Sequence, residues 1–425
     1  MLFLIASLLV LMALNVPIAF SLAAAPILYL LANPRIPLLM TVQQMFSGVD
    51  SFVFLAVPFF ILSGDLMHRG GISARLIDLS EALLDRFTGG LAMACAFASM
   101  IFASISGSGP ATTAAIGGAI LPGLVERGYG REWSVALMAS SGVIGPIIPP
   151  SITMVIYGAM TGTSIAALFL GGFVPGVMIG VGLMIISYLH AKRVGVRRLS
   201  ERGAHKSIGK AFLDAAWALG MPVVILGGIL GGVFTPTEAA VVSVVYALFV
   251  CLVIYRSLKI TNLPAIFKCS ATTTALVMII LANAAIFAWL VSAEQVPQKV
   301  IALFQSVTNN RFFVLLIVNV FLLIIGCFID TSSALVMTVP TLVPLATAVG
   351  VDPLHLGPII CINLVVGMAT PPVGLTLFTA CAIGKVPIAR VVRPIMPMIL
   401  IMVVVLLIVT YVPSVVLFLP RLLLG

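Results

Sequence analysis

Apolar segments long enough to cross a membrane recur along this chain of 425 residues. A membrane-spanning helix needs about 20 apolar residues. Residues 169–189, 215–234, 239–255, 271–291 and 395–413 approach or reach that length. Inside a bilayer only helices and closed barrels satisfy their own backbone hydrogen bonds, and runs this long are helical. The sequence therefore predicts an all-α polytopic membrane protein.

The composition argues against a soluble domain of any size. Hydrophobic residues make up 61% of the chain and charged residues 8%, whereas a soluble domain is roughly half apolar and about a quarter charged. This excludes a cytosolic enzyme, a secreted disulfide scaffold and a nucleic-acid-binding protein. The net charge of +9 does not favour nucleic acid, because the basic residues lie in short connectors. The six cysteines form no CxxC pair, so we expect buried thiols.

Basic residues indicate the orientation of the spans. The polar connector 191–214 carries seven Lys and Arg residues, so the positive-inside rule predicts that it is cytoplasmic. Arg256, Lys259 and Lys268 mark the same side two spans later. Residues 2–32 are apolar without the basic start and cleavage site of a secretory signal. We expect them to form one kinked helix or two short helices.

The connector 235–238 has no basic residue, as expected on the opposite side. Thr235 at the N-cap, Pro236 at N1 and Glu238 at N3 predict a capping box that opens the next helix. We interpret Glu238 as this structural cap, and a carboxylate in a proton path is the alternative.

The chain contains an internal repeat at a constant offset of 222 residues. Glycines and prolines constrain backbone shape, so their coincidence predicts one fold present in two copies. The coinciding pairs are Pro122 and Pro344, Gly128 and Gly350, Gly145 and Gly367, Pro149-Pro150 and Pro371-Pro372, Gly162 and Gly384, and Pro175 and Pro397.

The two copies carry opposite charge signals. The first has Arg127 and Arg131 in one connector and no charge in residues 163–170. In the second copy, residues 348–356 correspond to the connector with Arg127 and Arg131, and they contain no Lys or Arg. The uncharged connector 163–170 corresponds to a segment of the second copy that has Lys385, Arg390 and Arg393 close by. This exchange predicts inverted-topology repeats, as in many secondary transporters.

Each repeat has two features that do not suit ordinary spanning helices. The first is a pair of arms of about 15 residues flanking a polar tip, which is short for the hydrocarbon core and predicts a re-entrant hairpin. The arms are 89–103 and 111–125 around the tip 104–110, and 312–325 and 334–348 around the tip 326–333. The second feature is an apolar helix broken by a double proline, at 145–151 and again at 367–373.

Tips and breaks together provide oxygen ligands. Broken backbone must line protein or a watered cavity, and its carbonyls suit a small cation such as Na⁺. Serine hydroxyls at the first tip, and Asp330 with its neighbours at the second, add oxygens. We predict one cation site per repeat between tip and break, and an anionic substrate between the two tips. The alternatives are serines bonded to their own backbone, glycines used for packing and prolines acting as simple kinks.

These motifs resemble those of the large membrane subunit of TRAP transporters (tripartite ATP-independent periplasmic transporters). The resemblance is carried by residues 231–240 (GGVFTPTEAA), residues 106–111 (SGSGPA) and the two Gly-x-x-x-Pro-Pro breaks, and it extends over essentially the whole chain. It implies a bacterial inner-membrane elevator-type secondary transporter that is driven by sodium and is not an enzyme. It further implies two partners, a small four-helix membrane subunit and a periplasmic substrate-binding protein. The small subunit is not expected to be fused to this chain.

The resemblance also implies the site residues and the cargo. The expected Na⁺ ligands, about two sites in all, are Ser104, Ser106, Gly145 and Ile148 in the first repeat and Gly326, Gly367 and Thr370 in the second. The expected substrate contacts are Ser108, Ser151 and Asp330. The cargo is a small organic anion, for which the resemblance favours sialic acid, with C4-dicarboxylates as the alternative. No organic cofactor is expected.

We predict five parts in the chain. These are N-terminal scaffold helices (1–86), the first repeat core (87–190), the basic cytoplasmic connector (191–214), central scaffold helices (215–310) and the second repeat core (311–425).

Two rival functions fit the sequence less well. An intramembrane hydrolase built on Ser108 would need a general base at its depth, and the four histidines lie near predicted membrane edges. A passive channel would need polar positions along whole helices, whereas the polar groups here gather at tips and breaks.

Overall fold

The fold is all-helical in the part of the chain that the computed structural model describes, residues 2–14, 16–33, 36–196, 207–307 and 310–425. Eight helical runs there are long and apolar enough to cross a membrane. Four of them, Ile165–Val194, Ile208–Leu230, Pro236–Ile254 and Ile388–Tyr411, contain or overlap predicted spans. The fifth predicted span lies within Ile260–Ala293. The prediction of a polytopic helical membrane protein is confirmed.

The described residues of the first half form eleven α-helices and two short irregular helices. These are α1 (Leu2–Ala13), α2 (Ile18–Ala32), α3 (Leu39–Val49), η1 (Phe52–Leu55), α4 (Ala56–Arg69), α5 (Ile72–Leu84), α6 (Gly90–Ser106), α7 (Gly109–Thr112), the π-helix η2 (Thr113–Gly117), α8 (Gly118–Glu126), α9 (Arg131–Gly142), α10 (Ile152–Thr161) and α11 (Ile165–Val194). The apolar N-terminal segment therefore forms two helices, with Pro17 at the start of the second.

The second half begins after the basic connector, of which residues 197–206 lie outside the described residues. Its elements are α12 (Ile208–Leu230), α13 (Pro236–Phe249), η4 (Val250–Ile254), η5 (Ile260–Asn262), α14 (Leu263–Ala293), α15 (Val296–Val307), α16 (Arg311–Phe328), α17 (Thr331–Ala348), α18 (Pro353–Gly367), α19 (Leu375–Gly384), α20 (Ile388–Tyr411) and α21 (Pro413–Leu424).

Helix boundaries recur at the offset seen in the sequence. α8 ends at Glu126 and α17 at Ala348, and α9 begins at Arg131 and α18 at Pro353, each pair 222 residues apart. The same shift brings α6 onto α16, α10 onto α19 and α11 onto α20 to within a few residues. It also brings α5 onto α15. The shared glycines and prolines therefore correspond to shared breaks in the helices.

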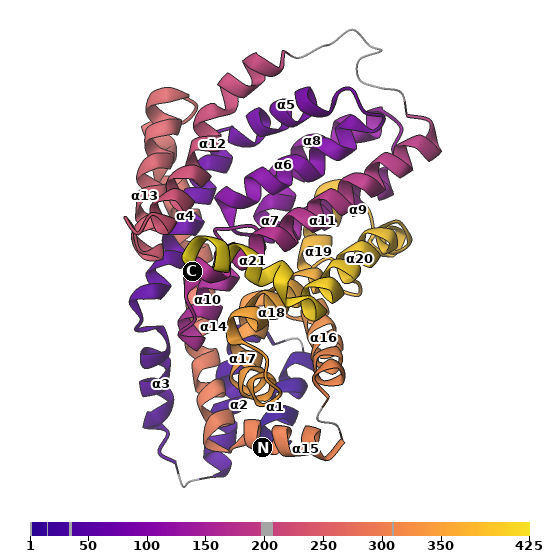
Figure 1. Cartoon of the computed structure of the whole chain (residues 1–425). Coiled ribbons are helices and arrows are strands. Elements are labelled where there is room, and N and C mark those ends of the chain that lie inside the picture. Colours follow the sequence, from indigo (N-terminus) through magenta and orange to yellow (C-terminus); the bar gives the residue numbers. More distant parts are fainter. Residues whose placement is uncertain (1, 15, 34–35, 197–206, 308–309) are drawn as a thin grey trace.

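The helices pack in two groups that are joined through α14. α4 packs against α13, and α14 packs against α2, α3 and α4 and also against α17 of the second repeat. Thr235 and Glu238 form a capping box at the start of α13, where the Thr235 backbone N–H donates to Glu238 Oε2 at 2.8 Å. In the other group the repeats interlock, because α10 packs against α17 and α19 packs against α9. Figure 1 shows the first-repeat helices α6, α8 and α9 above the second-repeat helices α16, α17 and α18.

Both double-proline breaks interrupt a helix, as predicted. α9 ends at Gly142 and α10 starts at Ile152, while α18 ends at Gly367 and α19 starts at Leu375. The peptide bonds Pro149-Pro150 and Pro371-Pro372 are both cis.

The hairpin arms are longer than the sequence analysis predicts. α6 has 17 residues, and α16 and α17 have 18 each. The helices continue into segments predicted as polar tips, because apolar residues such as Ile105 are buried there. Only Gly107-Ser108 and Ile329-Asp330 remain outside helices at the two tips. Arm length therefore gives no support to a re-entrant second hairpin.

Of the six cysteines, five are buried and Cys269 is exposed.

We predict that Gly367→Ala destabilises the protein. A Cβ at Gly367 would lie 2.5 Å from the Cα and carbonyl carbon of Gly326, and backbone atoms cannot move aside as a side chain can. We expect a loss of about 1–3 kcal/mol, seen as a lower Tm of the purified protein in detergent.

Gly227→Ala on α12 is the matched control, because nothing lies within 4 Å of its added Cβ and its φ is ordinary. Its Tm should be unchanged or higher, since alanine favours helix. A wild-type Tm for Gly367→Ala would show that the two glycines are not in tight contact.

Candidate functional site

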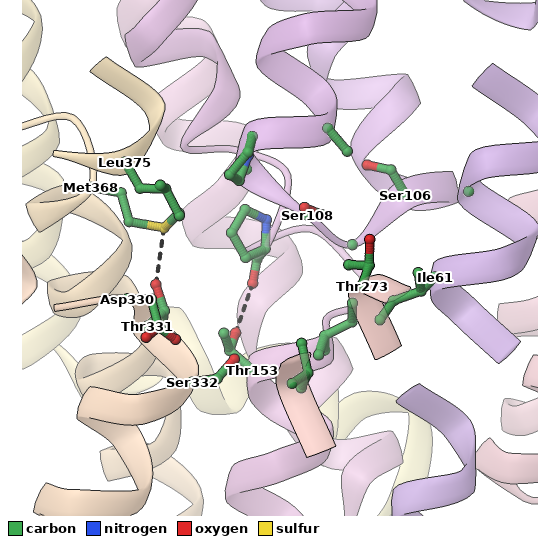
Figure 2. Close-up of a pocket in the computed structure, with 18 of the residues that line it drawn as sticks. Ile61, Ser106, Ser108, Thr153, Thr273, Asp330, Thr331, Ser332, Met368 and Leu375 are labelled. Atoms are coloured by element: carbon green, nitrogen blue, oxygen red, sulfur yellow. Dashed lines mark hydrogen bonds between the residues drawn. The ribbon is translucent and has the colours of Figure 1, made fainter. Parts of the chain in front are cut away.

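A cavity of about 430 Å³ lies between the two tips. Ser106 and Ser108 line it from the first tip, and Asp330, Thr331 and Ser332 line it from the second. Figure 2 shows these two groups on opposite sides of the space. A third wall comes from α4 and α14, which belong to the other packing group. The cavity therefore lies where the two repeats meet α4 and α14.

The first tip is held against the first break by a close backbone approach. α6 ends at Ser106, and Gly107 follows as its C-cap with a positive φ of 60° that suits glycine. A Cβ at Gly107 would lie 2.6 Å from the Pro150 carbonyl oxygen. Likewise, a Cβ at Gly145 would lie 2.5 Å from the Ser108 carbonyl oxygen. Two glycines, one on the tip and one on the break, thus allow the backbones to touch.

Hydroxyl groups at the first tip form a chain. The Ser106 Oγ lies 2.9 Å from Thr112 Oγ1, and Thr112 Oγ1 donates to the Ser108 carbonyl at 2.8 Å. Ser108 occupies the N-cap position of the helical run that starts at Gly109, but its side chain makes no capping bond. Gly109 and Ala111 line the cavity and their N–H groups receive no capping bond from Ser108, while Pro110 between them has no N–H.

The second tip is built differently. Asp330 caps α17, accepting from the Ser333 backbone N–H at 3.0 Å and from the Ser333 hydroxyl. Thr331 Oγ1 donates to the Met368 sulfur at 2.9 Å, which joins the tip to the second break (Figure 2). The Gly374 N–H also donates to the Cys327 carbonyl at 3.1 Å. The second tip and break are therefore joined by hydrogen bonds as well as by glycine contact.

Several carbonyl oxygens at the tip–break contacts lack a donor. In the described part of the chain no hydrogen bond reaches the carbonyls of Ser104, Gly145 and Ile148 in the first repeat, or those of Gly326 and Thr370 in the second. Ser104 with Gly326, and Ile148 with Thr370, are equivalent at the 222-residue offset. Unpaired carbonyl oxygens are ligands that Na⁺ accepts in broken helices. The residues present therefore fit a small cation.

The predicted site residues fall into two groups. Ser106, Ser108 and Asp330 line the cavity. The others do not line it and lie instead within or behind the tip–break contacts; they are Ser104, Gly145, Ile148, Ser151, Gly326, Gly367 and Thr370. The side chains of Ser104 and Thr370 donate to carbonyls of their own helical turns.

Ser151 differs most from its predicted role as a substrate contact. It is fully buried, accepts from the Met154 N–H at 3.3 Å as the cap of α10, and donates to the Pro146 carbonyl. Its neighbour Thr153 lines the cavity in its place.

The sequence analysis missed residues that the fold brings to the site. Asp65 lines the cavity from α4 and accepts from Ser270 Oγ on α14 at 2.5 Å. As the one acidic residue in the apolar stretch 52–69, it could have been noticed. Thr112 has a weaker signal in the sequence, which is a hydroxyl one helical turn after Ser108 at the tip.

The charge in the cavity is negative. Asp65 and Asp330 supply two carboxylates, and no Lys, Arg or His is among the described residues that line it. An anion bound here would have to be held by hydroxyls, helix N–H groups and any bound cation.

Comparison with known proteins agrees with this architecture. Residues 5–415 match the family model described as tripartite ATP-independent periplasmic transporter, DctM component. The C4-dicarboxylate TRAP transporter large permease protein DctM of Pseudomonas aeruginosa is 41% identical, over 89% of this chain and 88% of its own length. The sialic acid TRAP transporter large permease protein SiaM of Vibrio cholerae is 38% identical, over 97% and 96%.

Two further comparisons concern chain length and fold. The isethionate TRAP transporter permease protein DctMQ of Oleidesulfovibrio alaskensis is 40% identical over 95% of this chain, which spans 64% of that relative's length. The crystal structure of the Alcanivorax borkumensis YdaH transporter shares the fold, with a TM-score of 0.61 at 15% identity over 91% of this chain and 89% of that one.

The full-length family match and the identities near 40% lead to one conclusion. The chain belongs to the DctM family of TRAP transporter large permeases, multi-pass proteins of the bacterial inner membrane that carry organic anions by secondary transport and are not enzymes.

Proposed function

We propose that this permease couples the uptake of a small organic anion to sodium, with the anion bound in the cavity between the two tips. The observation that carries the proposal is the meeting of both tips and both breaks around one space of about 430 Å³. A periplasmic substrate-binding protein would deliver the anion, and a small four-helix subunit would accompany this chain in the membrane.

One sodium ion would bind between tip and break in each repeat. The unpaired carbonyls of Ser104, Gly145 and Ile148, with Ser106, support the first site. Those of Gly326 and Thr370, beside Gly367, support the second. Each ion would neutralise part of the negative charge around the substrate and so couple the two bindings.

The transport step would be an elevator movement of inverted repeats. The interlocked repeats would move as one body against α4, α13 and α14. The inversion is supported by the exchange of basic residues between the two copies, with Lys385, Arg390 and Arg393 on one side and Arg127 and Arg131 on the other.

The lining of the cavity favours a hydroxylated monoanion such as sialic acid over a C4-dicarboxylate. A dicarboxylate would bring two negative charges beside Asp65 and Asp330 without a basic side chain to pair them. Sialic acid has one carboxylate, for the N–H groups of Gly109 and Ala111 that Ser108 leaves uncapped, and hydroxyls that can donate to the two aspartates.

The coupling can be tested in proteoliposomes that contain this chain, the small subunit and the binding protein. We expect labelled sialic acid to accumulate with Na⁺ outside and to stop accumulating when K⁺ replaces it, because the proposed coupling draws on the sodium gradient. Accumulation of equal size in K⁺ would contradict sodium coupling.

We predict that Asp330→Asn lowers uptake by about tenfold or more, because a hydrogen bond to a charged group contributes about 1.5–3 kcal/mol. Asp352→Asn is the control, since Asp352 also caps a helix, α18, by accepting from the Leu354 N–H at 2.8 Å, but does not line the cavity. Equal uptake by the two variants would remove Asp330 from the site.

The substrate class can be tested by competition in the same vesicles. Unlabelled sialic acid should inhibit uptake, whereas succinate at equal concentration should inhibit at least tenfold less. Because the binding protein also selects, the thermal stability of the permease alone should be measured with each anion. Greater stabilisation by succinate would favour the dicarboxylate alternative.

A further inference from the structure

The hydroxyl chain at the first tip has a direction. A carbonyl oxygen can only accept, so the 2.8 Å contact between Thr112 and the Ser108 carbonyl uses the one hydrogen of the Thr112 hydroxyl. The 2.9 Å contact between Ser106 and Thr112 can be a hydrogen bond at the same time only if Ser106 donates. The Ser106 hydrogen is thus turned toward Thr112.

This direction leaves the acceptor side of Ser106 available. Its oxygen has two lone pairs, and neither is used in the contact with Thr112. Both residues are buried, at 3% and 1% exposure, but Ser106 lines the cavity and Thr112 does not. A hydroxyl that donates to a neighbour is also a more strongly polarised acceptor. The arrangement suits a cation beside Ser106.

The break of the first repeat lies against the same chain. A Cβ at Gly145 would lie 2.7 Å from Thr112 Oγ1 and 2.5 Å from the Ser108 carbonyl oxygen. Thr112 is therefore packed between the tip hydroxyl and the backbone of the break, where the first sodium site is proposed.

The second repeat has no such chain. At the 222-residue offset Ser106 corresponds to Phe328 and Thr112 to Ala334, and neither side chain carries oxygen. A structural need shared by both hairpins would not explain hydroxyls in only one of them. The pair is specific to the first tip.

We propose that Thr112 is a positioning residue for the first cation site, which holds the Ser106 hydrogen away so that the Ser106 oxygen faces the ion. The proposal rests on the sodium coupling proposed above. Without the Thr112 hydroxyl, Ser106 would be free to turn its hydrogen toward the ion and would bind it less well.

The test titrates the purified chain with Na⁺ alone, at constant ionic strength with choline, and follows thermal stability. Thr112→Val keeps the shape of the side chain and removes its hydroxyl. The apparent Na⁺ affinity of one binding phase should therefore fall about tenfold. The Tm measured without sodium should stay near that of the wild type. Thr112→Ser should restore the affinity to within about threefold. Thr113→Val is the matched control, because Thr113 Oγ1 donates only to the Gly109 carbonyl at 3.0 Å and does not line the cavity.

A double-mutant cycle separates positioning from packing. In a Ser106→Ala background Thr112→Val should cause no further loss of Na⁺ affinity, because its effect acts through Ser106. Thr112→Ala replaces Thr112→Val in the cycle if the valine variant does not fold. Wild-type affinity in Thr112→Val, additive losses in the cycle, or no rescue by Thr112→Ser would each overturn the proposal. If the wild-type chain itself were not stabilised by Na⁺ relative to choline, the proposed sodium coupling would fail together with this proposal.

Discussion

The structure depends on the constraint that backbone polar groups in a membrane protein must find partners within the protein. Two helices are interrupted here, and each interruption is covered by the hairpin tip of its own repeat. Gly107 brings the first tip to Pro150, and Gly326 brings the second to Gly367. Tip and break therefore form one structural unit, because neither could be left uncovered in lipid.

The same contacts leave a covered break with oxygen ligands for the ions proposed above. Glycine allows two backbones to meet without a side chain between them, so carbonyl oxygens such as those of Gly145 and Gly326 stay close to the contact and unpaired. A tip held by a dense set of side-chain hydrogen bonds would satisfy these oxygens and remove them as ligands. Close approach with few donors therefore links the stability of the fold to its proposed chemistry.

The sequence predicted the spans, the repeat and the position of both breaks, because proline and glycine act on the backbone where they stand. It did not predict how far the helices run into the tips, since the burial of Ile105 depends on tertiary packing. Nor could it pair Asp65 with Ser270, 205 residues away, or show that Ser151 is used as a helix cap. Backbone features that depend on local residues could be predicted from the sequence, whereas side-chain roles that depend on distant partners could not.

The two repeats share backbone features and differ in side chains. This difference fits the proposal that main-chain oxygens bind the ions and that side chains at the tips bind the substrate. The unpaired carbonyls of Ser104 and Gly326 are equivalent, so similar ions can be bound in both halves by main-chain oxygen whatever the side chains are. Ser108, by contrast, corresponds to Asp330, so the cavity presents a hydroxyl on one side and a carboxylate on the other. A single asymmetric substrate needs unlike walls, and duplication followed by divergence of the tip side chains supplies them without altering the breaks.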